Sequence, residues 1–161
     1  MSTSGMAEGC RTCASLAGTA RISPGPVIYE GTHWIVDHAY PCRMKGWLVL
    51  VLKRHAEALH DLTPEEFAEL GTLLGRTTER LHRTLDCQKE YVMQIAEGEG
   101  FAHVHVHVVP KPRDLPVELK GPQVFALIRA DDARVPPSAG AIVPPDELAP
   151  FCERLRASFP R

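Results

Sequence analysis

Hydrophobic positions along the chain recur with the period of a strand in some segments and with the period of a helix in others. The order of these segments predicts the order of the elements. Short segments rich in β-branched and aromatic residues lie between turn residues, which is typical of strands. The run WLVLVL is apolar without a break, so we expect its strand to be buried on both faces. The predicted strands cover residues 27–29, 33–37, 47–52, 91–95 and 101–109.

One long segment between these strands has a helical period instead. Thr63 is a good N-cap, Pro64 suits the first helical position, and Glu66 completes a capping box. Leucines then recur every three or four residues, which predicts a helix to about residue 86 with one apolar stripe. A shorter amphipathic helix is predicted for residues 146–158. Strands, one long helix, further strands and a tail favour an α+β fold with an antiparallel sheet.

Composition and charge narrow the possible partners and location. The chain has 161 residues, which is the usual size of a single domain, so we expect one domain over residues 1–161. Its formal net charge is -2, so no basic surplus indicates nucleic acid or an anionic membrane as partner. The N-terminus has no signal-peptide pattern, and the apolar run 47–52 is too short to span a bilayer. Five cysteines in no dense framework lead us to expect a cytoplasmic protein with reduced thiols.

The stretch HVHVHVV, residues 103–109, is the most specific chemical feature of the sequence. Because side chains alternate across a strand, His103, His105 and His107 share one face, and the valines between them share the other. Neighbouring histidines on a strand lie about 6.6 Å apart and the outer pair about 13 Å apart. We expect the valines to pack against the core and the histidines to face a groove that solvent can reach.

Three interpretations of the histidine face remain open from the residues alone. The histidines could form a polar face without further function. Two of them could bind a catalytic metal ion together with a distant ligand, since an H-x-H pair can supply two zinc ligands. They could also act directly on phosphate, because a neutral imidazole is a good nucleophile near pH 7 and a second one can stabilise the phosphoryl oxygens or the leaving group.

Cys10 and Cys13 form a CxxC pair near the N-terminus. Such a pair can be a redox site, two free thiols, a disulfide, or half of a tetrahedral zinc site. Zinc would need two further ligands, and the chain has eight histidines to offer.

These motifs together resemble the histidine triad (HIT) hydrolases. HVHVHVV matches the H-φ-H-φ-H-φ-φ signature of that family, where φ is apolar, at every position. Pro110 fits too, as does LVLVLKRHAEAL with Lys53 and His55, and CRTCASLAG resembles the start of zinc-containing members. The resemblance covers about residues 10–113 and leaves residues 114–161 as a C-terminal extension. It implies a HIT-like α+β fold, a homodimer, and cleavage of a bound nucleotide at its α-phosphate.

The resemblance also implies a role for each residue of the motifs. His105 matches the nucleophile, which forms a transient nucleotidyl-histidine, and His107 matches the residue that contacts the phosphate and assists the leaving group. His103 matches the residue that supports the strand or, in zinc-containing members, ligates the metal. The implied ligands of a structural zinc ion are Cys10, Cys13, His55 and His103.

The sequence departs from the family pattern around the expected substrate site. Gly98-Glu99 stands where a Gly-Gln pair is usual, and Glu97 adds a second negative charge. Gln94 stands where many members have an asparagine that contacts phosphate, and Gly46-Trp47 replaces the usual Gly-His. Asp37 is the candidate for ribose binding, displaced by about two positions. The candidate substrate-binding residues are therefore Asp37, Gln94 and Glu99.

The function that these observations favour is a nucleotide hydrolase or transferase that cleaves a phosphate ester, an anhydride such as a dinucleoside polyphosphate, or a phosphoramidate. The alternative is a non-catalytic nucleotide- or protein-binding module with a structural zinc, in which nucleotide binds without turnover. A third hypothesis, a metal-dependent hydrolase with His105 and His107 as ligands, predicts loss of activity on chelation.

Overall fold

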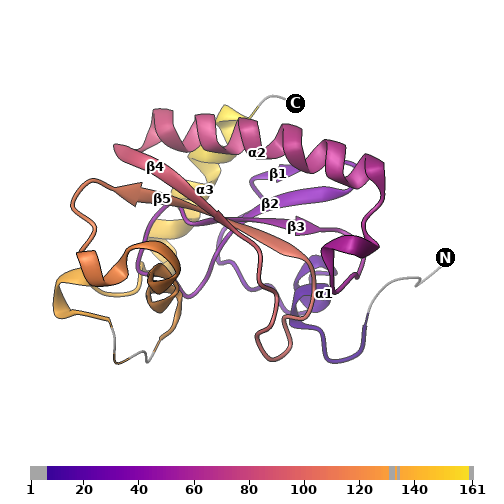
Figure 1. Cartoon of the computed structure of the whole chain (residues 1–161), viewed down its shortest axis with the longest axis horizontal. Helices are drawn as coiled ribbons and strands as arrows, with labels where there is room; N and C mark the ends of the chain where they lie inside the picture. Colours follow the sequence, from indigo (N-terminus) through magenta and orange to yellow (C-terminus); the bar gives the residue numbers. More distant parts are fainter. Residues whose placement is uncertain (1–6, 131–132, 134, 160–161) are drawn as a thin grey trace.

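The computed structural model describes residues 7–130, 133 and 135–159 of the chain (Figure 1). One five-stranded sheet has the order β1-β2-β3-β5-β4, and every neighbouring pair is antiparallel. The predicted α+β class with an antiparallel sheet and one long helix is therefore confirmed. The elements are α1 (Arg11–Leu16), β1 (Tyr29–Glu30), β2 (Trp34–His38), β3 (Leu48–Leu52), α2 (Pro64–Thr84), β4 (Cys87–Met93), β5 (His105–Pro112) and α3 (Pro145–Ser158), with 3-10 turns at Leu59–Asp61, Val117–Leu119, Gly121–Ile128 (η3) and Pro137–Ala139.

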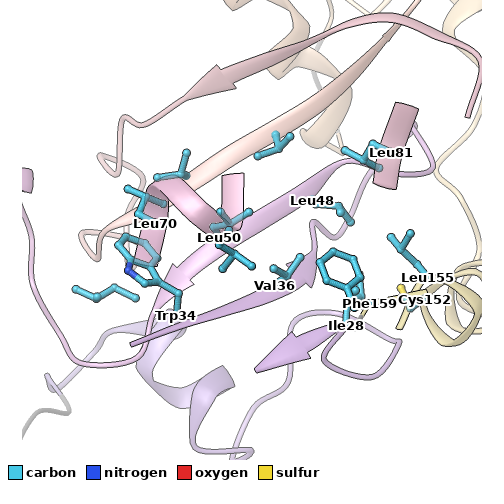
Figure 2. Close-up of a cluster of buried hydrophobic side chains, with 14 of the residues drawn as sticks. Ile28, Trp34, Val36, Leu48, Leu50, Leu70, Leu81, Cys152, Leu155 and Phe159 are labelled. Carbon is cyan, nitrogen blue, oxygen red and sulfur yellow. The ribbon is translucent and has the colours of Figure 1, made fainter. Parts of the chain in front are cut away.

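Helix α2 lies across one face of the sheet (Figure 1). Its start is the predicted capping box: the Thr63 hydroxyl accepts from the Glu66 backbone N–H, and the Glu66 carboxylate accepts from the Thr63 N–H. Every second side chain of β2, β3 and β5 packs under this helix, which leaves the alternate side chains on the opposite face. The buried cluster between sheet and helix, part of which Figure 2 shows, includes Trp34, Val36, Leu48, Leu50, Leu52, Leu70, Leu73, Leu81, Val104, Val106 and Val108.

The C-terminal extension packs on both sides of the sheet. The predicted last helix is confirmed as α3, and its buried side chains join the cluster under α2; these are Leu148, Phe151, Cys152 and Leu155. Figure 1 shows that η3 lies on the other side of the sheet from α2. There Val124, Ala126 and Leu127 form a second buried cluster with Trp47 and Val109. The extension is thus an integral part of the core on both faces.

The histidine strand differs from its predicted bounds. Strand β5 begins at His105, so His103 lies just before it, and the strand continues through Pro110 to Pro112. The predicted end at Pro110 is wrong because β5 pairs with β3 only as far as Val108. Beyond that point β5 is bonded on one side only, to β4, and a proline without an N–H is tolerated there.

Candidate active site and metal cluster

A cleft of about 760 Å³ lies on the face of the sheet opposite α2. Its floor is formed by the side chains that alternate with the buried ones, namely Ile35, Asp37, Val49, Val51, His105 and His107. Helix α1 and the loop before β5 border the cleft on one side, and η3 borders it on the other. Of the predicted catalytic histidines, the structure therefore brings His105 and His107 into one cleft.

The imidazole of His105 has a defined orientation. Its Nδ1 donates to the backbone carbonyl of His103 over 2.7 Å, so its single proton is on Nδ1 and the lone pair of Nε2 is free. Burial lowers the pKa of His105, and the hydrogen bond to His103 partly opposes that shift. The ring is therefore neutral at pH 7, with a bare nitrogen beside the cleft. That state is the one a nucleophilic imidazole requires.

His107 has the opposite arrangement of its ring nitrogens. The indole Nε1 of Trp47 lies 3.0 Å from His107 Nδ1, and an indole N–H can only donate. The proton of His107 is therefore on Nε2. Burial, followed by the nearby His105, lowers the pKa of His107 to about 3. The two ring centroids are 4.9 Å apart, so a bare nitrogen and an N–H donor lie side by side in the cleft.

The predicted substrate-binding residues are only partly gathered at the cleft. Asp37 lines it, but both carboxylate oxygens accept from the Arg21 guanidinium, at 2.6 and 3.1 Å. Burial raises the pKa of the Asp37 carboxyl, and the hydrogen bonds from Arg21 oppose that rise. The lining includes Glu97 but neither Gln94 nor Glu99. The roles assigned to Gln94 and Glu99 stay predictions.

The extension supplies one wall of the cleft, and no motif in the sequence marks it for that role. Phe125 of η3 lies edge-on to His107, with ring centroids 4.9 Å apart, and it also contacts Trp47 at 5.6 Å. Gln123 and Arg129 line the same side. The guanidinium of Arg43 donates to the carbonyls of Ala130 and Gly140, which ties the extension to the segment before β3.

His38 positions the loop that carries Trp47 to the cleft. Its Nδ1 donates to the Ala39 carbonyl over 2.7 Å, and its Nε2 accepts from the Gly46 N–H at 2.8 Å. The two ends of the loop 39–46 are thereby joined, directly before Trp47. No feature of the sequence marks His38 for this role. Burial lowers the pKa of His38 to about 4.

The buried His38 predicts a loss of stability in mild acid. Its pKa lies near 6.5 in the unfolded chain and is lower in the folded one, so the unfolded chain binds the proton more tightly. Its contribution is complete above the unfolded pKa and declines as the pH falls from about 6.5 to 4. We expect the stability difference between the native protein and His38→Gln to shrink by about 2 kcal/mol between pH 7 and 5. Urea unfolding at several pH values measures this difference.

The exposed His60 provides the control for that measurement. His60→Gln also removes one histidine, but from a side chain that is 85% exposed, so we expect it to follow the native pH dependence. An unchanged pH slope in His38→Gln would contradict a buried neutral His38.

Four side chains converge beside the start of β5 in a cluster that could hold a metal ion. These are Cys10, Cys13, His55 and His103, whose ligand atoms all lie within 4.8 Å of one another. The Sγ of Cys13 is 3.5 Å from His55 Nδ1 and 3.4 Å from His103 Nδ1, and the two Nδ1 atoms are 3.3 Å apart. The five cysteines all lie among the described residues and none is in a disulfide, so Cys10 and Cys13 are not bonded to each other. The structure thus brings together the four residues that the resemblance implies as ligands.

The distances within the cluster fit a tetrahedral zinc ion. Zinc–sulfur bonds of about 2.3 Å and zinc–nitrogen bonds of about 2.0–2.1 Å place sulfur and nitrogen about 3.6 Å apart and two nitrogens about 3.3–3.4 Å apart. His103 Nε2 donates to the Leu52 carbonyl over 2.7 Å, and His55 Nε2 lies 3.4 Å from the Glu57 carboxylate. Both histidines therefore turn a bare Nδ1 inward. Two lone pairs at 3.3 Å repel each other unless a cation lies between them, and outer hydrogen bonds of this kind are usual around zinc.

Comparison with known proteins gives a family match. The sequence profile of the family described as HIT domain matches residues 21–114. No curated protein sequence matches the chain. In the described part of the chain, no helix has the length and apolar character that a membrane span needs.

Solved structures resemble the fold over most of its length. A Hit-like protein from Bartonella henselae is 14% identical, with 96% of this chain and 99% of that one covered and a TM-score of 0.69. A zinc-bound histidine triad family protein from Mycobacterium smegmatis is 20% identical over 93% and 97% of the two chains, with a TM-score of 0.57. A hypothetical protein from Leishmania major is 26% identical over 68% and 78%, with a TM-score of 0.58.

Proposed function

This chain belongs to the HIT family, and from that premise we propose that it is a nucleotide hydrolase or transferase. It binds a nucleoside 5′-phosphate derivative in the cleft on the open face of the sheet. It cleaves at the α-phosphate through a covalent nucleotidyl intermediate on His105.

The observation that carries the proposal is the pair of complementary imidazoles. His105 Nε2 has a free lone pair because Nδ1 is held by the His103 carbonyl. His107 carries its proton on Nε2, two residues further along the same strand face. A nucleophile and a hydrogen-bond donor for the phosphoryl oxygens thus lie next to each other, and phosphoryl transfer asks mainly for such positioning.

The reaction has two steps. In the first, the lone pair of His105 Nε2 forms the N–P bond while the bond from phosphorus to the leaving group breaks, and the leaving group takes the bonding electrons. In the second, water attacks the phosphorus and the N–P bond breaks. The nucleoside monophosphate leaves, one water proton passes to solvent, and Nε2 of His105 recovers its lone pair.

Substrate binding is proposed from the lining of the cleft. Asp37 lines the cleft from β2 and is held in place by the Arg21 guanidinium. We propose that its carboxylate contacts the ribose of the nucleotide. Gln94 and Glu99 lie on the loop between β4 and β5, directly beside the lining residues 95–98, and we propose that they contact the substrate from there. Glu97 lines the cleft itself and would repel an additional phosphate on its side.

The Cys10, Cys13, His55 and His103 cluster is proposed to bind a structural zinc ion. The four side chains would occupy all four coordination positions of a bound ion and leave none for substrate or water. The ion would therefore hold α1 against the start of β5 and take no part in the reaction. The His103 carbonyl orients His105, so a fixed His103 also fixes the nucleophile.

A homodimer through the edge of the sheet is also proposed. Strand β4 is an edge strand, and Val92 on it and Ile95 just after it expose 48% and 49% of their surfaces. An unpaired edge with apolar side chains favours association with a second strand.

Trapping the intermediate tests the proposed function. We would mix the protein with dinucleoside polyphosphates and nucleoside phosphoramidates of several bases, quench with a denaturant that is not acidic, and measure the intact mass. A nucleotide-sized adduct on the native chain that is missing from His105→Asn is the expected result, and its mass identifies the base.

The alternative is a nucleotide- or protein-binding module with a structural zinc and no catalysis. The carboxylate of Glu97 within the cleft is the observation that favours it. Nucleotide binding by calorimetry, without adduct or product at high protein concentration, would support this alternative and contradict a hydrolase.

A further inference from the structure

Trp47 determines which ring nitrogen of His107 carries the proton. The indole lies directly before β3 and is fully buried, and its Nε1 donates to His107 Nδ1 over 3.0 Å. Because an indole N–H never accepts, this contact holds only while Nδ1 has a lone pair. The Nε2 proton of His107 therefore faces the cleft.

The surroundings of His107 also oppose a second proton. Phe125 covers one side of the ring with a centroid distance of 4.9 Å, and only 6% of the residue is exposed. A proton added to Nδ1 would point at the Trp47 N–H, and the contact would become repulsive. The titratable groups that line the cleft with His107 are His105 on its own strand and, on other segments, Arg11, Asp37, His38, Tyr40, Glu97 and Arg129. Trp47 is the only hydrogen-bond partner of His107 among the described residues.

A neutral His107 with its proton on Nε2 can stabilise charge but cannot transfer a proton. Giving up the Nε2 proton would leave an imidazolate, which is far too basic to form near pH 7. Accepting a proton is also blocked, because the one lone pair of the ring is already occupied by Trp47. His107 can therefore donate a hydrogen bond to the leaving group without acting as its general acid.

We propose that Trp47 restricts this site to nucleoside 5′-phosphoric anhydrides, whose leaving group departs as a stable anion without a proton. This inference rests on the proposed function. In the first step the P–O bond of the anhydride breaks, the phosphate or carboxylate leaves with the electron pair, and His107 Nε2–H donates a hydrogen bond to it. No proton transfer is needed for this step.

Phosphoramidates and alkyl esters, in contrast, require a proton donor for their leaving group. An amine or an alkoxide is a poor leaving group unless it receives a proton as its bond to phosphorus breaks. General-acid catalysis typically contributes about 10²–10⁴-fold to such a step. A site without a general acid loses that contribution for these substrates and keeps its rate for anhydrides.

A comparison of leaving groups tests the inference with the native protein. We would measure kcat/KM for a dinucleoside triphosphate and for the 5′-phosphoramidate of the same nucleoside. We expect the anhydride to be cleaved at least about 100-fold faster. We also expect the ¹⁵N spectrum of His107 to show a bare Nδ1 and a protonated Nε2 from pH 5 to 8.

Two variants separate the indole hydrogen bond from general effects on folding. Trp47→His replaces the obligate donor with a ring that can also accept, so we expect the preference for the anhydride to fall at least tenfold and the phosphoramidate rate to rise as the pH is lowered. Trp34→Phe is the matched control, since it removes the other indole, whose Nε1 donates to the Glu66 carbonyl on the opposite face of the sheet. That variant should lower stability and leave the preference unchanged.

The outcomes distinguish this inference from the proposed function. Equal cleavage of both substrates by the native protein, or a proton on Nδ1 of His107, overturns the restriction by Trp47 and leaves the hydrolase intact. No covalent adduct with either substrate overturns the proposed function and this inference with it. The inference is supported if the ratio of kcat/KM for the anhydride to kcat/KM for the phosphoramidate falls in Trp47→His and stays at the native value in Trp34→Phe.

Discussion

Replacing His105 with asparagine is expected to lower kcat by about 10⁴–10⁶-fold, because the attacking lone pair is lost and no other group in the cleft can replace it. The amide nitrogen of asparagine can still donate to the His103 carbonyl, so the local fold should persist. Nucleotide affinity should change little, since binding depends on the rest of the cleft. Steady-state hydrolysis and calorimetry on the same preparations measure the two quantities.

His60→Asn is the matched control for that substitution. It makes the same chemical change at an exposed histidine that does not line the cleft, and we expect native kcat. Substantial turnover in His105→Asn, within about tenfold of the native rate, would exclude His105 as the nucleophile. Activity that disappears on chelation while the fold persists would then favour the hypothesis of a catalytic metal at His105 and His107.

Loss of the metal cluster is expected to have the largest effect on stability. We expect Cys13→Ser to abolish zinc binding and to lower the free energy of unfolding by about 4 kcal/mol when free zinc is present at about 1,000 times its Kd. The physical reason is that the ion binds only the folded arrangement, where α1, the segment after β3 and the start of β5 meet. Zinc content by mass spectrometry and urea unfolding with and without added zinc measure both effects.

Cys152→Ala provides the control for this prediction. Its thiol is fully buried in α3, outside the metal cluster, so the variant should lose packing energy and still bind one zinc ion per chain. Zinc should raise the stability of Cys152→Ala but have no effect on Cys13→Ser. A native protein whose stability does not respond to zinc or chelator would contradict a structural metal site.

Local sequence patterns were sufficient for the type and order of the main elements, although the strand predicted at residues 91–95 runs from Cys87 to Met93 and the one predicted at 27–29 is Tyr29–Glu30. The capping residues of α2 and the apolar stripe after them depend only on neighbours within a few turns, so its start and type were predicted correctly. The alternation of histidine and valine likewise placed the valines in the core under α2. The end of the histidine strand was predicted wrongly, because it depends on which partner strand lies beside Pro110.

The cysteine and histidine cluster was predicted partly from a local pattern and partly from the resemblance to the family. The CxxC spacing indicated two ligands, and the other two came from the resemblance to the family. The structure brings all four together, across a separation of 93 residues between Cys10 and His103. Their common orientation, with each Nδ1 turned inward, follows from the Leu52 carbonyl and the Glu57 carboxylate, neither of which a motif marks.

By itself the sequence determined the α+β class, the long helix, the common face of His105 and His107, and the family, because each depends on the order and spacing of nearby residues. His103 was also expected on that face, but it lies before β5, is fully buried and belongs to the metal cluster. Only the tertiary structure decided the protonation of the two histidines. The His103 carbonyl fixes one ring, and Trp47, 60 residues away from His107, fixes the other. Only the tertiary structure also showed that Phe125 of the extension forms a wall of the cleft. Such contacts join segments that are distant in the chain, and the direction of a hydrogen bond is set by where those segments meet.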